Sequence, residues 1–380
     1  MQSPSMIELT WFRIVVLFFC SLIPSLCAQT SSAQTTDSKS WTTTTESHTS
    51  DTNPMRTTES HKQSANGTVD SQSIERLGPD GHYEPFYDIE KESVQVNDTT
   101  IRTVERTFNR DGSGQRVLTQ VTEEEKQSLP AGGEKVVRTT SDADLDGHLR
   151  FVQREVADTQ KPSPDVQERK TTVFLSDGMG GMVRSMQILE HEKHNSDRTV
   201  EVQKSTLLPD GAGNWQVNER KESTIKEDGK DRTTEEHVFR LGADDKLSLD
   251  SRTVGKESQT AAGEKRNTVE TYSTYIPGSA PDGNLHLSQR VTEVRQAPSA
   301  GAQATEQKLE QPDPGDPGAG LQLTTKTLDV VQPDASGTRE TRTIEVRDAS
   351  GSFTAVSFDT RKSDNIHAVN VDIAPQTKPK

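Results

Sequence analysis

Residues 146–154 read DGHLRFVQR, and this pattern of a turn, two spaced apolar residues and a basic residue returns along the chain. Apolar residues two positions apart match the period of a β-strand, and Asp-Gly before such a run is a hairpin signal. The motif occurs in five aligned copies: Leu149-x-Phe151-x-x-Arg154, Trp215-x-Val217-x-x-Arg220, Leu247-x-Leu249-x-x-Arg252, Leu285-x-Leu287-x-x-Arg290 and Leu321-x-Leu323-x-x-Lys326. These copies predict one strand that is repeated many times.

The turns before these strands recur at a nearly constant interval. They begin at Asp80, Asp111, Asp146, Asp177, Asp210, Asp244, Asp282, Asp316 and Asp348. The spacing of roughly 33 to 34 residues lies in the range of repeat architectures. Each unit reads as strand, loop, strand and turn, and most turns have three or more residues, which favours a bulged or longer hairpin loop. We therefore expect an all-β domain over residues 77–380, built of about nine antiparallel β-hairpins.

Sequential hairpins of this kind form an up-and-down meander. The low apolar content suits contacts between neighbours only, so we expect an elongated array rather than a closed barrel or a propeller. An outer-membrane barrel is disfavoured because its lipid-facing positions would be apolar along most of each strand. The apolar residues cluster near the Asp-Gly end of each hairpin, which predicts a narrow buried stripe along one side of the array.

The basic residue of the motif follows the second apolar residue by three positions. In a regular strand this odd offset would place the two residues on opposite faces. Either a β-bulge lies between them or both faces of the sheet are partly covered. The basic residues Arg154, Arg220, Arg252, Arg290 and Lys326 could form a ladder on one face. Because the net charge is -15, we expect them to pair with glutamates on neighbouring strands rather than to bind an anionic polymer.

The N-terminal residues read as a targeting segment. Residues 11–28 are WFRIVVLFFCSLIPSLCA, a short apolar run that ends in small residues, as in a secretory signal peptide cut after Ala28. An uncleaved membrane anchor is the competing interpretation, but the run is shorter than the roughly 20 residues of a span. Both cysteines, Cys20 and Cys27, lie in residues 1–28, so the exported chain would contain no disulfide.

Residues 29–76 are dominated by Ser, Thr, Gln and Asp, with few large apolar residues. Ordering such a segment costs about 1–2 kcal/mol per residue with little burial in return. We therefore predict a disordered Ser/Thr-rich spacer there. Asn66-Gly67-Thr68 and Asn97-Asp98-Thr99 match the N-glycosylation acceptor, but two matches are close to chance in a Thr-rich chain.

One acidic motif points to a metal. Asp142-x-Asp144-x-Asp146-Gly147 resembles the start of a calcium-binding loop, with carboxylates at alternate positions before a glycine. The closing bidentate Glu of such a loop is missing, because its place is Gln153. A calcium site at these three aspartates is one interpretation, and an acidic hairpin turn is the other. The sequence predicts no other cofactor.

The repeat is most irregular at residues 179–194 and at 311–320. The first of these stretches contains His191-Glu192-Lys193-His194, but its histidines are three positions apart, whereas the zinc-protease helix needs a spacing of four. We expect this segment to be a solvated loop. An enzyme would usually break the repeat where its site is built, so these two stretches are the places to look for one.

The composition limits the function classes. Only 29% of residues are hydrophobic and 4% aromatic, which excludes a polytopic membrane protein. The acidic balance argues against nucleic acid as a partner. We expect an exported, non-catalytic repeat protein, secreted, periplasmic or at the cell surface, that acts as a surface, scaffold or binding element for protein or polysaccharide. A secreted hydrolase with a carboxylate-based site and a calcium-dependent adhesion module are the alternatives.

Overall fold

The computed structural model describes residues 40–48, 54–63, 66–260, 263–276, 283–299, 301–313, 315–334, 337–348, 350–364 and 367–368. All of them lie in one structural unit, Lys39–Lys380. The predicted signal peptide, its two cysteines and residues 29–39 lie outside the described residues. Within the described residues, no helix is long and apolar enough to cross a membrane.

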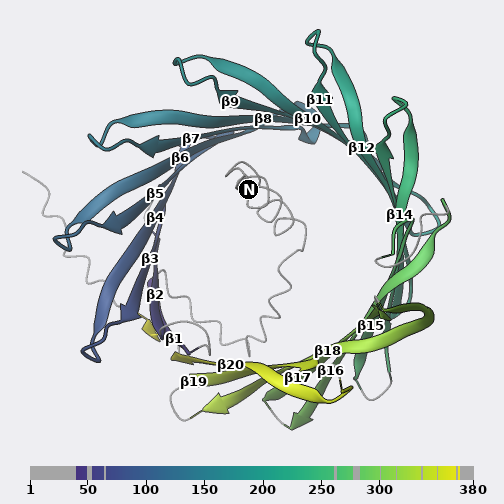
Figure 1. The fold of residues 1–380 in the computed structure, drawn as a ribbon. Helices are drawn as coiled ribbons and strands as arrows, with labels where there is room; N and C mark the ends of the chain where they lie inside the picture. Colours follow the sequence, from purple (N-terminus) through teal and green to yellow (C-terminus); the bar gives the residue numbers. More distant parts are fainter. Residues whose placement is uncertain are drawn as a thin grey trace, which may run out of the picture. The chain divides into compact units, whose positions relative to one another are not determined.

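The described chain consists almost entirely of strands (Figure 1). Apart from the 3-10 turn η1 (Pro130–Gly132), the elements in chain order are β1 (Ser40–His48), β2 (Met55–Gln63), β3 (Gly67–Leu77), β4 (Tyr83–Asn97), β5 (Thr100–Arg110), β6 (Arg116–Ser128), β7 (Glu134–Ala143), β8 (Leu149–Ser163), β9 (Val166–Ser176), β10 (Met182–His194), β11 (Thr199–Pro209), β12 (Trp215–Asp228), β13 (Asp231–Leu241), β14 (Leu247–Gln259), β15 (Lys265–Ser273), β16 (His286–Ser299), β17 (Ala302–Asp313), β18 (Asp316–Asp334), β19 (Gly337–Arg347), β20 (Phe353–Asp364) and β21 (His367–Ala368). The all-β prediction is confirmed.

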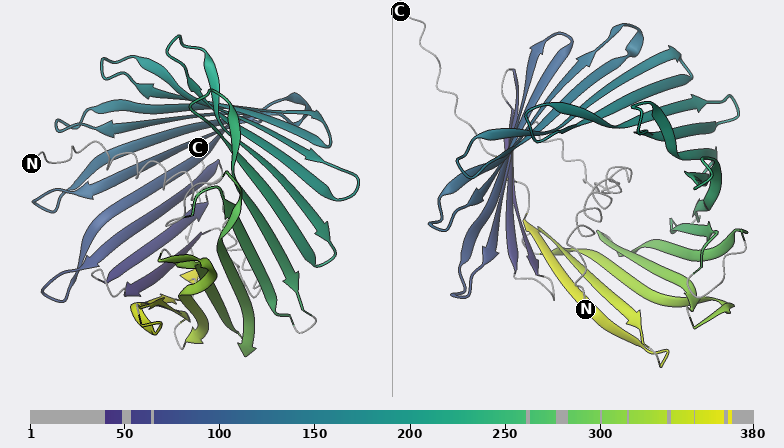
Figure 2. Two further views of the ribbon diagram at one scale, coloured as in Figure 1. Left: turned by 45° about the vertical axis from the view of Figure 1, so that its right-hand side comes forward. Right: turned by 45° about the horizontal axis from the view of Figure 1, so that its top comes forward.

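Each strand from β1 to β19 pairs antiparallel with the next strand in the sequence. Figure 2 shows the resulting succession of hairpins side by side. The predicted up-and-down meander of repeated hairpins is therefore confirmed.

The two ends of the meander meet over a short contact. Strand β1 pairs with β20 only through residues 360–363, and with β21 through His367 and Ala368. The rest of β20, from Phe353 to residue 359, has a strand partner only in β19 among the described residues. The sheet is therefore open along this part of its edge.

The sheet begins earlier in the sequence than predicted. Strands β1, β2 and most of β3 lie within residues 29–76, so the prediction of a disordered spacer was wrong for the part that the structure describes. Thr is frequent in these strands and favours extended backbone. Pairing with β4 continues the ladder into them without a large apolar core. The dipeptide Asn66-Gly67, between two polar strands, is the hairpin signal that the composition concealed.

Gly67 is required where β3 begins. A Cβ atom at this position would lie 1.9 Å from the carbonyl oxygen of Ser93 on β4. We expect Gly67→Ala to lower the melting temperature, because the backbone of β3 or β4 must move to relieve the clash. Gly112→Ala is the matched control, since open space surrounds its Cβ position. Equal melting temperatures for the two variants would contradict this packing of β3 on β4.

The predicted bulged hairpin loops are confirmed at most turns. In the turn from Asp210 to Asn214, the Asp210 N–H donates to the Asn214 carbonyl and the Gly213 N–H donates to the Asp210 carbonyl. Gly213 has a φ of +83°, so the turn ends in a left-handed residue that favours glycine. The same pair of hydrogen bonds recurs in the turns that begin at Gly78, Asp111, Leu129 (through Pro130), Asp144, Asn195, Gly242, Thr260 and Asp348, with small shifts in position.

The first aspartate of several turns also binds the turn with its side chain. Asp210 Oδ1 accepts hydrogen bonds from the N–H groups of Ala212 and Asn214. Asp111, Asp144, Asp177 and Asp348 accept bonds from the equivalent N–H groups of their turns. Four of these carboxyls have a lowered pKa, chiefly through the Ser113 hydroxyl at Asp111, Arg150 at Asp144, the Asn214 N–H at Asp210 and the Ser350 hydroxyl at Asp348.

These turn aspartates predict acid sensitivity. Because folding lowers the pKa of these carboxyls below the usual value of an aspartate, they stabilise the fold above that usual pKa, and the stabilisation is lost as pH falls through the folded pKa. We expect the melting temperature to fall below about pH 4. Replacing Asp111, Asp144, Asp210 and Asp348 together by Asn removes the titrating charge. The variant should show a shallower acid slope, and an unchanged slope would contradict the role of the turns.

A β-bulge recurs in every second strand, between the apolar pair and the basic residue of the motif. On β12, Val217 pairs with Leu207 and Glu219 pairs with Thr206, so Asn218 is the extra residue. The equivalent extra residues are Phe86, Thr119, Val152, Ser185, Asp250, Ser288, Thr324 and Val356. Three of them, Thr119, Ser288 and Thr324, donate their hydroxyl to a carbonyl on the opposite strand.

The bulge explains how the apolar and basic residues of the motif, which are an odd number of positions apart, can share one face of the sheet. One extra residue shifts the alternation by one position, so Phe151 and Arg154 lie on the same face of β8. Residues directly opposite each other on paired strands share that face throughout. We call the face that carries Arg154, Arg220, Arg252, Arg290 and Lys326 the arginine face.

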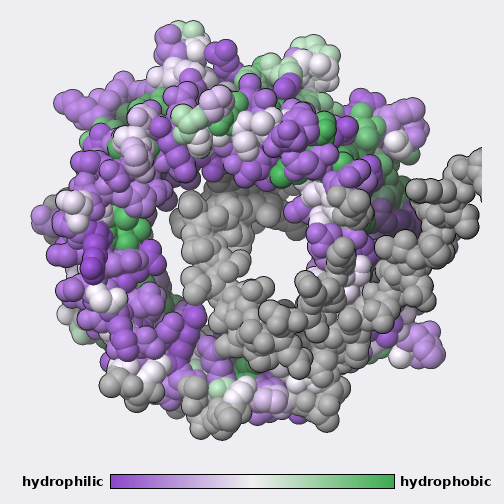
Figure 3. Space-filling view, turned by 180° about the vertical axis from the view of Figure 1, so that it is seen from behind, coloured by the Kyte–Doolittle hydropathy of each residue, from purple (hydrophilic) through white to green (hydrophobic). Residues whose placement is uncertain are grey.

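Both faces are also partly covered, and the core is thin. Val121 and Leu207 are buried on the arginine face, whereas Ala157, Val173 and Ile188 are buried on the opposite face. No large side chain among the described residues is completely buried. Figure 3 shows a surface dominated by hydrophilic residues, with hydrophobic residues scattered between them. The buried stripe is therefore narrow, as predicted, but buried apolar residues lie on both faces of the sheet.

Candidate functional site

The predicted ladder of basic residues exists, and most of its members pair with carboxylates. Arg252 donates to Glu235 on β13 at 2.7 Å, and Lys326 lies 4.0 Å from Glu345 on β19. Arg220 pairs with Glu222 of its own strand at 3.0 Å. Arg220 and Arg252 also lie over aromatic rings on the next strand, Phe239 at 4.9 Å and Tyr272 at 5.6 Å. The expected pairing with glutamates on neighbouring strands is therefore confirmed for Arg252 and Lys326, whereas the glutamate partner of Arg220 lies on its own strand.

Arg290 has the most extensive pairing of the five. Its guanidinium contacts Glu270 at 2.9 Å and Glu310 at 3.7 Å, one on each neighbouring strand. The hydroxyl of Tyr272 donates to Glu270 at 3.0 Å, and this bond together with Arg290 lowers the pKa of that carboxyl. Glu270 in turn raises the pKa of Arg290. This part of the ladder is a compensated ion-pair network.

Arg154 differs from the other members because no ion pair joins it to another described residue. Its Nε atom, like that of Arg220, is buried without a hydrogen-bond partner. Across the strands it faces Thr139 on β7 and Phe174 on β9, neither of which is charged. The ladder therefore has one position, on β8, where the cation lacks a counter-ion.

The three aspartates of the calcium interpretation have separate roles. Asp144 binds the turn N–H groups of Asp146 and His148 and forms an ion pair with Arg150 at 2.8 Å. Asp142 lies on β7 and accepts a hydrogen bond from Gln120 at 2.9 Å. Within the described part of the chain, no cluster of three or more His, Cys, Asp or Glu could hold a metal ion. A calcium site at Asp142, Asp144 and Asp146 remains a prediction.

The segment from His191 to His194 lies in strand β10, not in a loop. Because side chains alternate along a strand, His191 and His194 point to opposite faces. His191 Nδ1 lies 3.5 Å from Glu168 Oε1 on β9, whereas His194 Nε2 lies 2.6 Å from Glu192 Oε1. The two histidines therefore belong to different surroundings.

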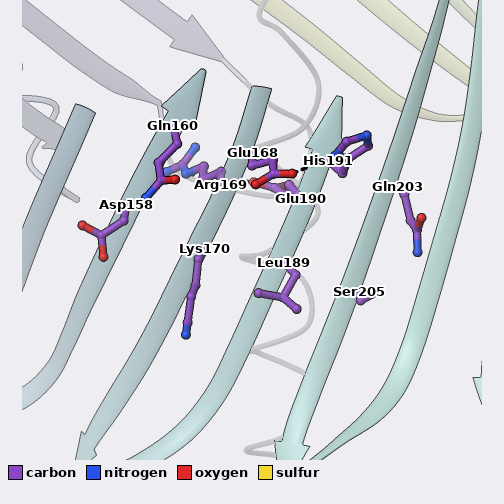
Figure 4. Close-up of a pocket in the computed structure, with 10 residues that line it drawn as sticks. All are labelled: Asp158, Gln160, Glu168, Arg169, Lys170, Leu189, Glu190, His191, Gln203 and Ser205. Atoms are coloured by element: carbon purple, nitrogen blue, oxygen red, sulfur yellow. Dashed lines mark ion pairs between the residues drawn. The ribbon is translucent and has the colours of Figure 1, made fainter. Parts of the chain in front are cut away.

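A pocket of about 520 Å³ lies over β8, β9, β10 and β11. Figure 4 shows its side chains, which come from all four strands. The lining residues are Asp158, Gln160, Glu168, Arg169, Lys170, Leu189, Glu190, His191, Gln203 and Ser205. A volume of this size lies in the usual range for small-ligand pockets. Three of the residues, Leu189, Glu190 and His191, belong to the irregular stretch 179–194.

Cross-strand register explains how this pocket forms. Asp158 lies opposite Lys170, and Gln160 lies opposite Glu168. On the next strand, Leu189 lies between Lys170 and Ser205, and His191 lies between Glu168 and Gln203. All eight therefore share the arginine face. Glu190 belongs to the opposite face, where Lys204 holds it at 3.0 Å.

The residues that line the pocket are mostly polar or charged, and they are chemically mixed. It presents the carboxylates of Asp158 and Glu168, the amides of Gln160 and Gln203, and the ammonium of Lys170. Ser205 is 8% exposed, whereas Leu189 is 39% exposed and offers an apolar contact. Such a lining offers hydrogen-bond donors and acceptors together with a substantial apolar carbon surface. It is suited to a ligand with many hydroxyl groups.

The sequence pattern indicates only part of this pocket. Residues 189–191 belong to an irregular stretch of the repeat, whereas the pocket residues on β8, β9 and β11 do not. Their signal is a run of polar residues at alternate positions, such as Glu168 and Lys170. That signal is common in a polar repeat, so only the register between strands could identify the group.

Comparisons with known proteins give distant likenesses of structure. No family model matches the chain, and no curated protein matches it. The FrpB iron transporter from Neisseria meningitidis (F3-3 variant) has a TM-score of 0.43 and 7% identity, over 86% of this chain and 74% of its own. CdiB from Acinetobacter baumannii has a TM-score of 0.33 and 10% identity, over 85% of this chain and 60% of its own. A porin-like protein from Bacteroides uniformis has a TM-score of 0.12 and 12% identity, over 73% and 95%.

Proposed function

We propose that this chain is an exported, non-catalytic β-repeat protein that binds polysaccharide through the arginine face of β8 to β11. The observation that carries the proposal is the polar pocket of about 520 Å³ on that face. Export is inferred from the signal-like sequence of residues 1–28. The remaining hairpins serve as the scaffold that fixes the four strands.

The pocket's chemistry favours a saccharide over an apolar ligand. Gln160 and Gln203 each offer an amide that donates and accepts hydrogen bonds, as a vicinal pair of hydroxyls requires. Leu189 provides an aliphatic surface against which the C–H groups of a sugar ring can pack. The pocket is open along the sheet, so a polymer can continue beyond it over neighbouring strands.

The test is a binding screen of the full-length chain against soluble polysaccharides, read by affinity electrophoresis. We expect retardation in at least one polysaccharide gel. Gln203→Leu should weaken that binding about tenfold, the change expected from losing a hydrogen bond with an unpaired partner left behind. Gln307→Leu is the matched control, because Gln307 is also exposed on a strand but lies outside the pocket on β17.

Three results would contradict the proposal. The first is the absence of binding to every polysaccharide in the panel. The second is an equal loss of binding for Gln203→Leu and Gln307→Leu, which would place the interaction outside the pocket. Capture of a partner protein that Gln203→Leu releases, without polysaccharide binding, would also contradict the saccharide assignment.

A further inference from the structure

One copy of the repeat departs from the others beside the pocket. The residue just before the bulge is uncharged at eight positions, namely Pro85, Leu118, Phe151, Val217, Leu249, Leu287, Leu323 and Ala355. On β10 the same position is Arg184. The basic position of the motif, two residues after the bulge, is Gln187 in this copy. In this copy the basic residue, Arg184, therefore precedes the bulge instead of following it.

This departure places an arginine on each side of Phe174 in the cross-strand register. Phe174 on β9 lies directly opposite Arg154 on β8 and directly opposite Arg184 on β10. All three share the arginine face. The strands of Arg154 and Arg184 are therefore separated by one strand, β9, and Phe174 lies between the two residues in the cross-strand register.

Neither arginine has a counter-ion in the described chain. The side chain of Arg154 is partly buried, with its Nε unpartnered, and Arg184 is exposed with no ion pair. The nearest residues on the same face, Thr139, Thr172 and Gln187, are uncharged. The other arginines of the ladder, by contrast, pair with glutamates. An uncompensated pair of guanidiniums attracts an anion, and the planar guanidinium matches a carboxylate.

We propose that Arg154 and Arg184 bind a carboxylate group of the polysaccharide whose sugar rings occupy the pocket. This proposal rests on the proposed function and names its substrate class, an acidic polysaccharide built of uronic acids. Arg154 and Asp158 are four residues apart on β8, so the carboxylate site lies about 13 Å from the pocket along the strand. A ligand that reaches both sites is an oligomer rather than a single sugar.

The anion preference is local, because the chain as a whole is acidic. The net charge of -15 repels a long polyanion at low salt. Asp158 at the near end of the pocket and Glu168 at its far end also disfavour carboxylates there. The ligand is therefore expected to present a carboxylate to Arg154 and Arg184, and hydroxyl groups to the pocket.

The experiment compares a short oligomer of galacturonic acid with the same oligomer after methyl esterification, by calorimetric titration of the full-length chain. The two probes have the same rings and differ in charge. We expect the acid to bind more tightly than the ester, with an affinity that falls as salt rises. Arg184→Leu restores the residue that other copies carry and should weaken binding of the acid about tenfold, while binding of the ester stays unchanged.

Arg232→Leu is the matched control. Arg232 is exposed on β13, so its substitution removes the same charge at a position away from Arg154 and Arg184. If Arg232→Leu weakens acid binding as much as Arg184→Leu, the effect is one of net charge and the carboxylate site is wrong. If the ester binds as tightly as the acid, the uronate assignment is wrong while the polysaccharide function stands. If Arg184→Leu weakens acid binding but Gln203→Leu does not, the anion site stands and the pocket is wrong. If neither probe binds, the uronate proposal is overturned.

Discussion

Val173→Asp is expected to destabilise the sheet by about 3–5 kcal/mol, the usual effect of an uncompensated buried charge. Val173 is 4% exposed on the face opposite the arginines, among the few buried apolar residues of the thin core. Its cross-strand neighbour Glu155 is also acidic, so the new carboxylate has a like charge directly opposite. Thermal and urea unfolding followed by circular dichroism measure the loss.

Leu175→Asp is the control for this prediction. Leu175 lies two residues further along β9 and on the same face, but it is 37% exposed. Its replacement should cost less than about 1 kcal/mol, as is usual for surface substitutions. Equal destabilisation by the two variants would mean that burial on this face does not stabilise the sheet.

Deletion of Asn218 is expected to destabilise the chain by about 3 kcal/mol, near the upper end for single changes. Asn218 is the extra residue of the bulge on β12, and its side chain is exposed. Without it, Val217 and Arg220 can no longer share a face, so either Val217 leaves Leu207 or Arg220 leaves Phe239. The measurement is the unfolding midpoint in urea.

Substitution of the same residue separates the backbone effect from the side chain. Asn218→Ala keeps the extra residue and should change stability by less than about 0.5 kcal/mol. If the deletion is as well tolerated as the substitution, the bulge is not what aligns the apolar and basic residues of the repeat.

The sequence predicted the repeat because its turn signals are local. Asp210 and Gly213 form their hairpin turn through bonds within five residues, so the pattern of residues carries the structure. The bulge was only one of two alternatives, because the odd spacing of Phe151 and Arg154 fits either arrangement. The register of β8 on β7 distinguishes the two alternatives. Register depends on how two strands pair, so the pattern of one strand alone does not determine it.

The first strands were missed for a different reason. Residues 40–77 contain almost no large apolar side chains, so composition indicated disorder. Pairing with β4 supplies backbone hydrogen-bond partners that cannot be inferred from amino-acid composition, and Ile74 is buried in β3. The pocket was missed in part because Asp158, Lys170, Leu189 and Ser205 are distant in sequence and meet only through successive cross-strand pairs.

Disulfide formation across the bulge on β10 tests the account most directly, because the bulge sets which residues share the arginine face. With Cys20 and Cys27 replaced by Ser, one variant carries cysteines at Leu175 and Val183, which lie directly opposite each other. A second variant carries them at Leu175 and Arg184, the pair that would face each other if Ser185 were not an extra residue. The account predicts rapid oxidation of the first pair and slow oxidation of the second. The reverse order would place Arg184 on the other face and contradict both the bulged repeat and the site beside it.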